Sequence, residues 1–432
     1  MSAESVVAIA RDLIRIDTSN YGDAPGPGER EAAEYVADFL SDLGLKPVLR
    51  ESEPGRTSLT ALWNGADSSR PPLVVHGHLD VVPAFANDWT VDPFGGDIKD
   101  GMVWGRGAVD MKGVNAMYLE AVRRLITSGR EPARDIVLAF FADEEHGGAR
   151  GAKWMVENHP DDFHGATEAV SEVGGFSIQL GDKRTYLIQT GEKGIQWLRL
   201  IASGTQGHGS LVHRDNAVTY LAAALSRIGT HRWPLDITPT VETLLRGAAK
   251  ILDLEYEASE ERIAEIIERF GPVARMIEGT MRNTSNPTMM DAGYKVNVVP
   301  DTAEAFVDTR YLPGQQESVL RKVEELSGTH VKVEPYIEER ALDLPFDTPL
   351  VHKMIAALHT VDPDAAVLPY LMMGGTDNKH LADIGIAGYG FAPLKLPVDL
   401  DFGSLFHGID ERVPIESLEV GTDVMVQFLT DC

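Results

Sequence analysis

Two short apolar runs that stop abruptly at histidine or charged residues are the strongest constraint on the fold of this chain. The segments PLVVHGHLD (72–80) and DIVLAFFADEE (135–145) each hold an unbroken apolar stretch. Such runs are typical of central strands in a parallel sheet that is covered on both faces. Between them, Val114–Ile126 has helical spacing and the position of the crossover helix in a βαβ unit. These patterns predict a layered α/β domain.

A second pattern begins near residue 192 and predicts a smaller domain inserted into the first. Strand and helix signals follow one another in the order β-α-β-β-α-β, which is that of a ferredoxin-like sandwich. The strands are expected over 195–201, 294–299, 303–310 and 331–337, and the helices over 216–228 and 318–326. We interpret 230–291 as an extra segment with two helices, near 241–252 and 259–270. The larger domain then comprises 1–191 and 339–432, and the smaller one 192–338.

Charge and composition limit the partners and the location of the protein. The 39 basic and 66 acidic residues give a net charge of −27, which would repel nucleic acid in the absence of a local basic stripe. No apolar run reaches the roughly 20 residues that a transmembrane helix needs. The first residues lack the pattern of a secretory signal, and Cys432 is the single cysteine. We therefore expect a cytoplasmic protein without nucleic-acid or membrane partners.

His78 and Asp80 follow the first apolar run two residues apart. Side chains at i and i+2 of an extended chain point the same way, so the Asp80 carboxylate could accept the imidazole N–H while the other ring nitrogen binds a metal. Alternatively, the two residues belong to an ordinary surface loop. The motif alone leaves both interpretations open.

Two further motifs carry carboxylates next to predicted strands and helices. The glycine-rich loop GRGAVDMKG displays Asp110 just before the crossover helix, and ADEEHGG places Asp143, Glu144 and Glu145 at the end of the second apolar run. Adjacent carboxylates repel one another, which suggests that a cation offsets the repulsion. Glu144 and Glu145 diverge, so one could bind metal while the other acts as a base. An exposed turn and a solvated aspartate are the alternatives.

Glu172 in SEVGG and His407 in FHGIDER complete the set of candidate ligands. A mixed set of histidines and carboxylates suits zinc or another first-row divalent ion. Five candidates exceed the needs of one tetrahedral zinc, so two metals bridged by a carboxylate are the more economical interpretation.

These five motifs, in this order and approximate spacing, resemble those of the M20 metallopeptidases over nearly the whole chain. The forms GHGS and HGIDER resemble the aminoacylase-1 and carboxypeptidase S branch of that family. The resemblance implies a zinc-peptidase-like three-layer catalytic domain with an inserted ferredoxin-like lid, through which a homodimer could form. It also implies two divalent ions, zinc or else cobalt or manganese.

The resemblance further implies roles for the motif residues. Asp110 would bridge the metals, with His78 and Glu172 on one metal and Glu145 and His407 on the other. A cis peptide would follow Asp110. The remaining roles are general base for Glu144, orientation of His78 for Asp80, oxyanion stabilisation for His208 from the same or the partner subunit, and substrate contacts for Asn297, Arg310, Gly375 and Thr376.

The predicted reaction is hydrolysis of an amide bond by a metal-bound hydroxide, with Glu144 as general base. The product would be an amino acid with a free carboxylate. Dipeptides, C-terminal peptides and N-acyl amino acids all meet this description. The alternatives are an N-deacylase of the acetylornithine or succinyl-diaminopimelate type and a catalytically silent metal-containing binding protein.

Overall fold

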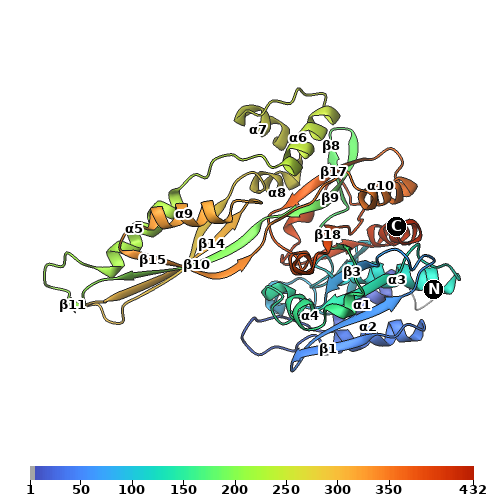
Figure 1. Ribbon diagram of the computed structural model, residues 1–432, viewed down its shortest axis with the longest axis horizontal. Coiled ribbons are helices and arrows are strands. Elements are labelled where there is room, and N and C mark those ends of the chain that lie inside the picture. Colours follow the sequence, from blue (N-terminus) through green and yellow to red (C-terminus); the bar gives the residue numbers. More distant parts are fainter. Residues whose placement is uncertain (1–4) are drawn as a thin grey trace.

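A ten-stranded mixed sheet forms the centre of the larger part of the molecule in this computed structural model, which describes residues 5–432 (Figure 1). The strand order is β1-β2-β6-β3-β7-β18-β9-β16, and β8 and β17 also pair with β9. Its strands are β1 (Val48–Glu53), β2 (Arg56–Trp63), β3 (Leu73–His78), β6 (Ile136–Phe141), β7 (Glu168–Ser171), β8 (Phe176–Leu180), β9 (Lys183–Glu192), β16 (Leu342–Asp343), β17 (Ala366–Met372) and β18 (Ala387–Gly390). β6, β3, β7 and β18 run parallel, as the unbroken apolar runs predicted.

Helices cover both faces of this sheet, and its central strands bury apolar residues on each face. On β3, Leu73 and Val75 belong to one core while Val74 belongs to another. The first core is shared by α1 (Val6–Arg15), α2 (Arg30–Asp42), α3 (Lys112–Thr127), α10 (Pro349–Val361) and α12 (Ile415–Asp431). The opposite core holds α4 (Ala152–Asn158) and Leu381 of α11 (Asn378–Leu381). The three-layer prediction for this part is therefore confirmed.

A four-stranded antiparallel sheet extends away from the larger part and forms the lid (Figure 1). Its order is β12-β14-β10-β15, made by β10 (Gly194–Ser203), β12 (Thr284–Ala292), β14 (Thr302–Tyr311) and β15 (Val331–Glu339). Helices α5 (Ala217–Thr230) and α9 (Gln316–Ser327) pack on it around Leu198, Leu200 and Val307. This is the ferredoxin-like arrangement that the sequence predicted.

One strand of the lid lies outside its predicted range. The strand expected over 294–299 is wrong: β12 occupies Thr284–Ala292, and only β13 (Val298–Val299) lies within the predicted range, paired with β11 (Gly207–His208). β12 is an edge strand with most side chains exposed and with Pro287 at a register shift. An exposed edge strand has no apolar alternation, and proline is tolerated there, so the usual strand signal is missing.

The extra segment 230–291 holds three helices, α6 (Pro239–Ile251), α7 (Glu260–Glu268) and α8 (Ala274–Gly279), so the prediction of two helices missed α8. Its last residues, 284–291, form most of the lid strand β12 and are not part of an insertion. The core of the larger part includes Val241 and Leu245 of α6 and Ile263 of α7, and α6 lies against β17. These helices therefore pack against the ten-stranded sheet of the larger part, although the sequence analysis placed them in the smaller domain. The residue boundaries between the two parts stay a prediction.

The remaining strands form a small sheet at the rim of the larger part. Its order is β19-β5-β4, with β4 (Asp97–Lys99), β5 (Met102–Trp104) and β19 (Arg412–Pro414). The pairing of β5 with β19 holds the loop before α3 beside the segment that follows His407. Among the helices of residues 5–432, none has the length and apolar character required to cross a membrane.

Candidate metal centre

The predicted ligands meet at the edge of the sheet where the parallel strands end. His78 is the last residue of β3, Glu172 follows β7, and Glu145 lies in the short turn after β6. Parallel neighbours bring their carboxyl ends to one edge, which is the usual place for a site in an open α/β sheet. Asp110 just before α3 and His407 before β19 reach the same edge. The Asp110–Met111 peptide is cis, as the family resemblance implied.

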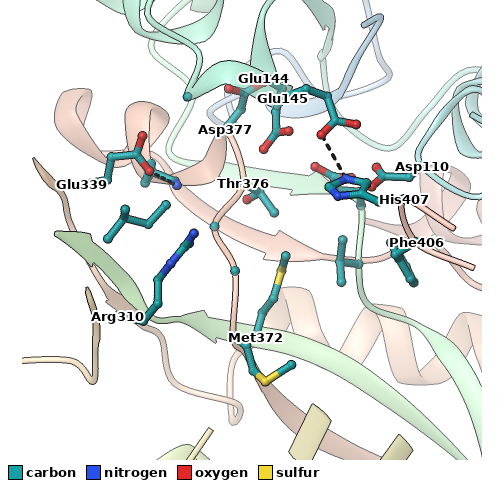
Figure 2. Close-up of a pocket in the computed structure, with 18 of the residues that line it drawn as sticks. Asp110, Glu144, Glu145, Arg310, Glu339, Met372, Thr376, Asp377, Phe406 and His407 are labelled. Carbon is teal, nitrogen blue, oxygen red and sulfur yellow. Dashed lines mark hydrogen bonds and ion pairs between the residues drawn. The ribbon is translucent and has the colours of Figure 1, made fainter. Parts of the chain in front are cut away.

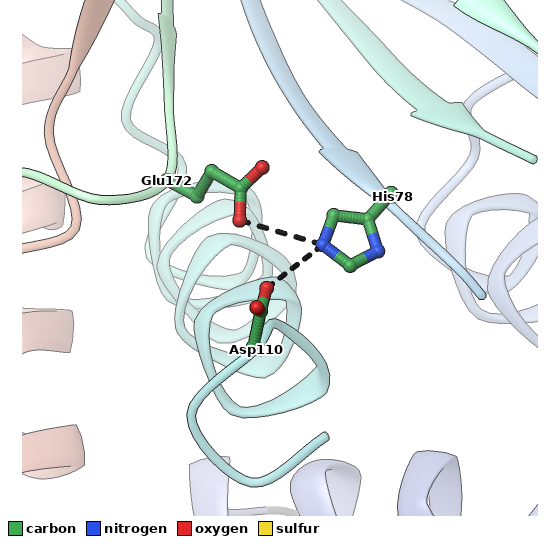
Figure 3. Close-up of side chains that lie close together, drawn as sticks. All are labelled: His78, Asp110 and Glu172. Carbon is green, nitrogen blue, oxygen red and sulfur yellow. Dashed lines mark hydrogen bonds and ion pairs between the residues drawn. The ribbon is translucent and has the colours of Figure 1, made fainter. Parts of the chain in front are cut away.

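The five side chains form two groups of three that share Asp110. In the first group, His78 Nε2 lies 3.0 Å from Asp110 Oδ1 and 3.4 Å from Glu172 Oε2 (Figure 3). In the second, His407 Nε2 lies 3.0 Å from Glu145 Oε2 and 3.3 Å from Asp110 Oδ2 (Figure 2). In each group the possible ligand atoms lie within 4.8 Å of one another. Asp110 thus offers one carboxylate oxygen to each group.

Electrostatics at the centre favour cations. Burial raises the pKa of Glu172 to about 8, and burial next to Glu172 raises the pKa of Glu144 well above its ordinary value. Hydrogen bonds to Asp110 and Glu145 raise the pKa of His407 to about 10. In addition, Glu145 Oε1 is buried without a hydrogen-bond partner among the described residues. Imidazole nitrogens and crowded carboxylate oxygens are the donor set of divalent metal ions, so these residues fit a metal pair.

Asp80 makes different contacts from those that its spacing suggested. His78 Nδ1 donates to the backbone carbonyl of Asp80 at 2.8 Å, while the nearer carboxylate oxygen is 3.7 Å away. The Asp80 carboxylate instead accepts the backbone N–H groups of Glu144 and Glu145, at 3.1 and 3.0 Å, and the amide of Asn20 at 2.8 Å. The predicted carboxylate–imidazole hydrogen bond is therefore wrong. Asp80 orients His78 through its backbone and holds the Glu144–Glu145 turn through its side chain.

A cavity of about 460 Å³ opens beside the metal centre and contains several of the predicted substrate residues (Figure 2). Arg310, Gly375 and Thr376 line it. Arg310 forms a fork with Asp308, and the N–H and hydroxyl of Thr376 both donate to the buried Glu192 at 2.7 Å. Thr376, for which a substrate contact was predicted, thus has both its N–H and its hydroxyl occupied within the protein.

His208 and Asn297 lie elsewhere. β11, which ends at His208, is at the far end of the lid from the catalytic sheet (Figure 1). His208 pairs with Val298, next to Asn297, and both His208 and Asn297 are exposed. Neither residue lines the cavity described above.

The structure adds residues that the sequence did not single out. Lys379 and Glu339 form a buried ion pair in the cavity wall, and Asp377 lies beside Glu144 (Figure 2). Glu411 is fully buried behind Asp110. Glu411 belongs to the motif HGIDER, and Lys379 follows Thr376 by three residues. Sequence spacing gives no sign of their partners, which are 40 to about 300 residues away in the chain.

Comparison with known proteins agrees with this geometry. The family model described as "Peptidase family M20/M25/M40" matches residues 74–431. The chain belongs to this family. Its fold matches the M20 family metallo-carboxypeptidase Sso-CP2 of Sulfolobus solfataricus with a TM-score of 0.75 at 19% identity, over 99% of both chains.

Two relatives are similar to this M20 family member in sequence over most of its length. Aminoacylase-1 of Sus scrofa is 27% identical over 98% of this chain and 94% of its own length. The N-fatty-acyl-amino acid synthase/hydrolase PM20D1 of Bos taurus is 27% identical over 92% of this chain and 82% of its own length. The predictions of an M20 metallopeptidase fold and of a metal-dependent hydrolase acting on amide bonds are confirmed.

Proposed function

We propose that the protein is a two-metal hydrolase that releases an amino acid with a free carboxylate, and that N-acyl amino acids are its preferred substrates. The observation that carries the proposal is the pair of ligand groups that share Asp110. His78 and Glu172 would hold one ion with Asp110, and Glu145 and His407 would hold the other. Zinc is the ion that this donor set suits best, with cobalt and manganese as alternatives.

Glu144 is the proposed general base. When bound, two divalent ions polarise the substrate carbonyl and make a water more acidic. Glu144 takes a proton from the attacking water as the water oxygen bonds to the substrate carbonyl carbon. It then passes this proton to the nitrogen of the leaving amine as the C–N bond breaks. Support comes from its position in the cavity wall and from its pKa, which burial raises well above the ordinary value and so favours holding a proton between the two steps.

Arg310 is the proposed partner of the substrate carboxylate. Its guanidinium lies in the cavity wall, and Asp308 holds it in a fork at 2.7 and 3.2 Å. A guanidinium held in this way offers its remaining N–H groups to a carboxylate as charge-assisted hydrogen bonds. Gly375 also lines the cavity, and its lack of a side chain makes room for Lys379, whose Nζ would lie 1.9 Å from an added Cβ.

The preference for an acyl group over a free amine follows from the charges in the cavity. Outside the ligand groups and Glu144, the carboxylates of the described residues in this cavity are Asp377 and Glu339. Burial raises the pKa of Asp377 well above its ordinary value, and Glu339 is neutralised by Lys379. Burial of Asp377 and the ion pair of Glu339 make both carboxylates poor partners for the ammonium group of a dipeptide. The rest of the wall includes Trp197, Met372 and Phe406, which suit an apolar acyl chain, and PM20D1 is named for such substrates.

A homodimer through the lid is proposed to complete the site, with His208 and Asn297 serving the partner's metal centre. Their distance from the cavity of their own chain supports this arrangement. Apolar side chains next to them support a protein contact at the lid tip, since Val212, Tyr294 and Val296 are between 75% and fully exposed. We place the dimer in the cytosol, as the cysteine usage suggests.

A hydrolysis screen tests the proposal. Metal-free protein is reloaded with Zn²⁺, Co²⁺ or Mn²⁺ and offered matched N-acyl amino acids and dipeptides. We expect EDTA-sensitive release of the amino acid, with kcat/KM higher for N-acyl amino acids than for dipeptides with the same C-terminal residue. Higher values for dipeptides would contradict the acyl preference, and no release from either class would contradict the proposed reaction.

A further inference from the structure

Glu411 occupies a position behind the metal centre that no role above explains. Its side chain is fully buried and lies four residues after His407. Burying a carboxylate is costly unless its oxygens are fully hydrogen-bonded. Its partners therefore indicate what it is for.

All the hydrogen bonds that the Glu411 carboxylate accepts come from the loop that carries Asp110. Oε1 accepts the backbone N–H groups of Val109 at 2.7 Å and Asp110 at 3.0 Å. Oε2 accepts the N–H of Gly107 at 3.1 Å and the guanidinium of Arg106 at 2.7 Å. Four donors on two oxygens saturate the carboxylate, so rotation of its side chain would break several bonds at once.

The backbone of the same segment adds further connections. The carbonyl of Glu411 accepts the N–H of Gly105 at 3.0 Å, and Arg106 also donates to the carbonyl of His407 at 3.4 Å. Residues that precede Asp110 are thereby joined to residues that follow His407. Because Arg106 neutralises Glu411, the pair adds no net charge to the centre, and its effect on the ligands is geometric.

We infer that Glu411 is a positioning residue that fixes Asp110 and His407 relative to each other, so that the shared carboxylate can serve both ligand groups. The inference rests on the proposed two-metal site. Glu411 fixes two members of one ligand group, Asp110 and His407. It fixes only Asp110 in the other group, whose further members are His78 and Glu172. Loss of Glu411 therefore weakens the first of these groups more.

The test is the metal affinity of the Glu411→Gln variant. The glutamine side chain keeps the size but turns an NH₂ toward N–H donors. We expect one of two Co²⁺ equivalents to bind about 10- to 100-fold more weakly, with a changed visible spectrum of the bound Co²⁺. The matched control is Glu120→Gln, which alters an equally buried carboxylate that accepts from Arg124 at 2.7 Å. Glu120 is ten residues, or about 15 Å of helix, beyond Asp110. This control is expected to bind both equivalents as the wild type does.

A double-mutant cycle separates positioning from general damage. His407→Ala and Glu411→Gln should weaken the same equivalent, and the double variant should lose less than the sum of the two free-energy changes because both act on one ligand group. If Glu411→Gln does not fold, Glu411→Asp, which keeps the charge but cannot reach both pairs of donors, takes its place with the same expected loss.

The outcomes distinguish this inference from the proposed function. Two equivalents bound with wild-type affinity and spectrum by either folded Glu411 variant, or full additivity with His407→Ala, would overturn the role of Glu411 alone. Failure of the wild type to bind two equivalents would overturn the two-metal site itself.

Discussion

The metal edge of the catalytic sheet and the tip of the lid hold their functional residues in opposite ways. At the sheet edge, Asp80 and Glu411 accept backbone N–H groups next to the ligands, and the ligands are mostly buried. At the lid tip, His208 is exposed at the end of the two-residue strand β11, and Asn297 is exposed just before the two-residue strand β13. One chain therefore builds a complete ligand cluster by itself, whereas we propose that the residues of the lid tip act on a partner subunit.

Removing the shared ligand should have the largest effect. Asp110→Ala deletes an oxygen donor from both groups, so we expect loss of both metal equivalents and activity at background. Metal analysis after dialysis, with hydrolysis of an N-acyl amino acid, checks this. Glu120→Gln serves as the folded control, and a variant that keeps one tight ion at full activity would contradict the sharing of Asp110.

Glu144→Gln should abolish proton transfer and leave the metals in place. The ligand groups do not include Glu144, so metal content is expected to stay at the wild-type value. The expected fall in kcat is about 10²- to 10⁴-fold. Measuring kcat together with metal content decides the matter, and near-normal turnover would remove Glu144 from the role of base.

His208→Ala tests whether the lid tip acts on a partner. We expect kcat to fall by about 10²- to 10³-fold, because one stabiliser of the oxyanion is lost. Mixing this variant with inactive Glu144→Ala should restore up to about a quarter of the wild-type activity, since half of the random dimers then carry one intact site. An inactive variant that no mixture restores would indicate that His208 acts within its own chain, and a fully active variant would indicate that it has no catalytic role.

Arg310→Lys should change substrate affinity more than turnover. Lysine keeps the positive charge but loses the fork with Asp308 and the paired N–H groups. We expect KM to rise about 10- to 100-fold, the equivalent of one or two charged hydrogen bonds. Steady-state kinetics on one N-acyl amino acid gives the answer, and a change confined to kcat would speak against a contact with the substrate carboxylate.

The smallest expected effect is a pH dependence of the stability of the metal-free protein. Hydrogen bonds to Asp110 and Glu145 raise the pKa of His407 from 6.5 to about 10. A group with a raised folded-state pKa stabilises the folded state fully below its unfolded value, and this stabilisation is lost as the pH rises through the folded value. Metal-free protein should thus lose stability between pH 6.5 and about 10, while metal affinity rises because His407 must release its proton. Thermal unfolding of EDTA-treated wild type and His407→Ala measures the difference; identical profiles would contradict it.

Much of the catalytic sheet could be predicted because its central strands are covered on both faces. Leu73–Val75 and Ile136–Phe141 must be apolar throughout, and this leaves a clear signal in the sequence. β12 left no such signal because it is an exposed edge strand with Pro287 in it. Local patterns identify elements that are buried and miss those held mainly by backbone pairing with a neighbour.

In the site, too, some features could be predicted from the sequence and others could not. Strand ends and motif order predicted the five side chains that converge, from His78 to His407. The supporting contacts were not predictable, since the partners of Glu411 lie about 300 residues earlier in the chain and those of the Asp80 carboxylate are backbone groups. Sequence spacing carries information about a residue and its near neighbours, and these contacts exist only once the chain has folded.

The number of metal ions bound per chain tests the central claim most directly. Metal-free wild-type protein titrated with Zn²⁺ should take up two equivalents, and hydrolysis of an N-acyl amino acid should reach its maximum only near the second. A single equivalent with full activity, or full activity in the presence of EDTA with no metal bound, would contradict a centre in which Asp110 is shared.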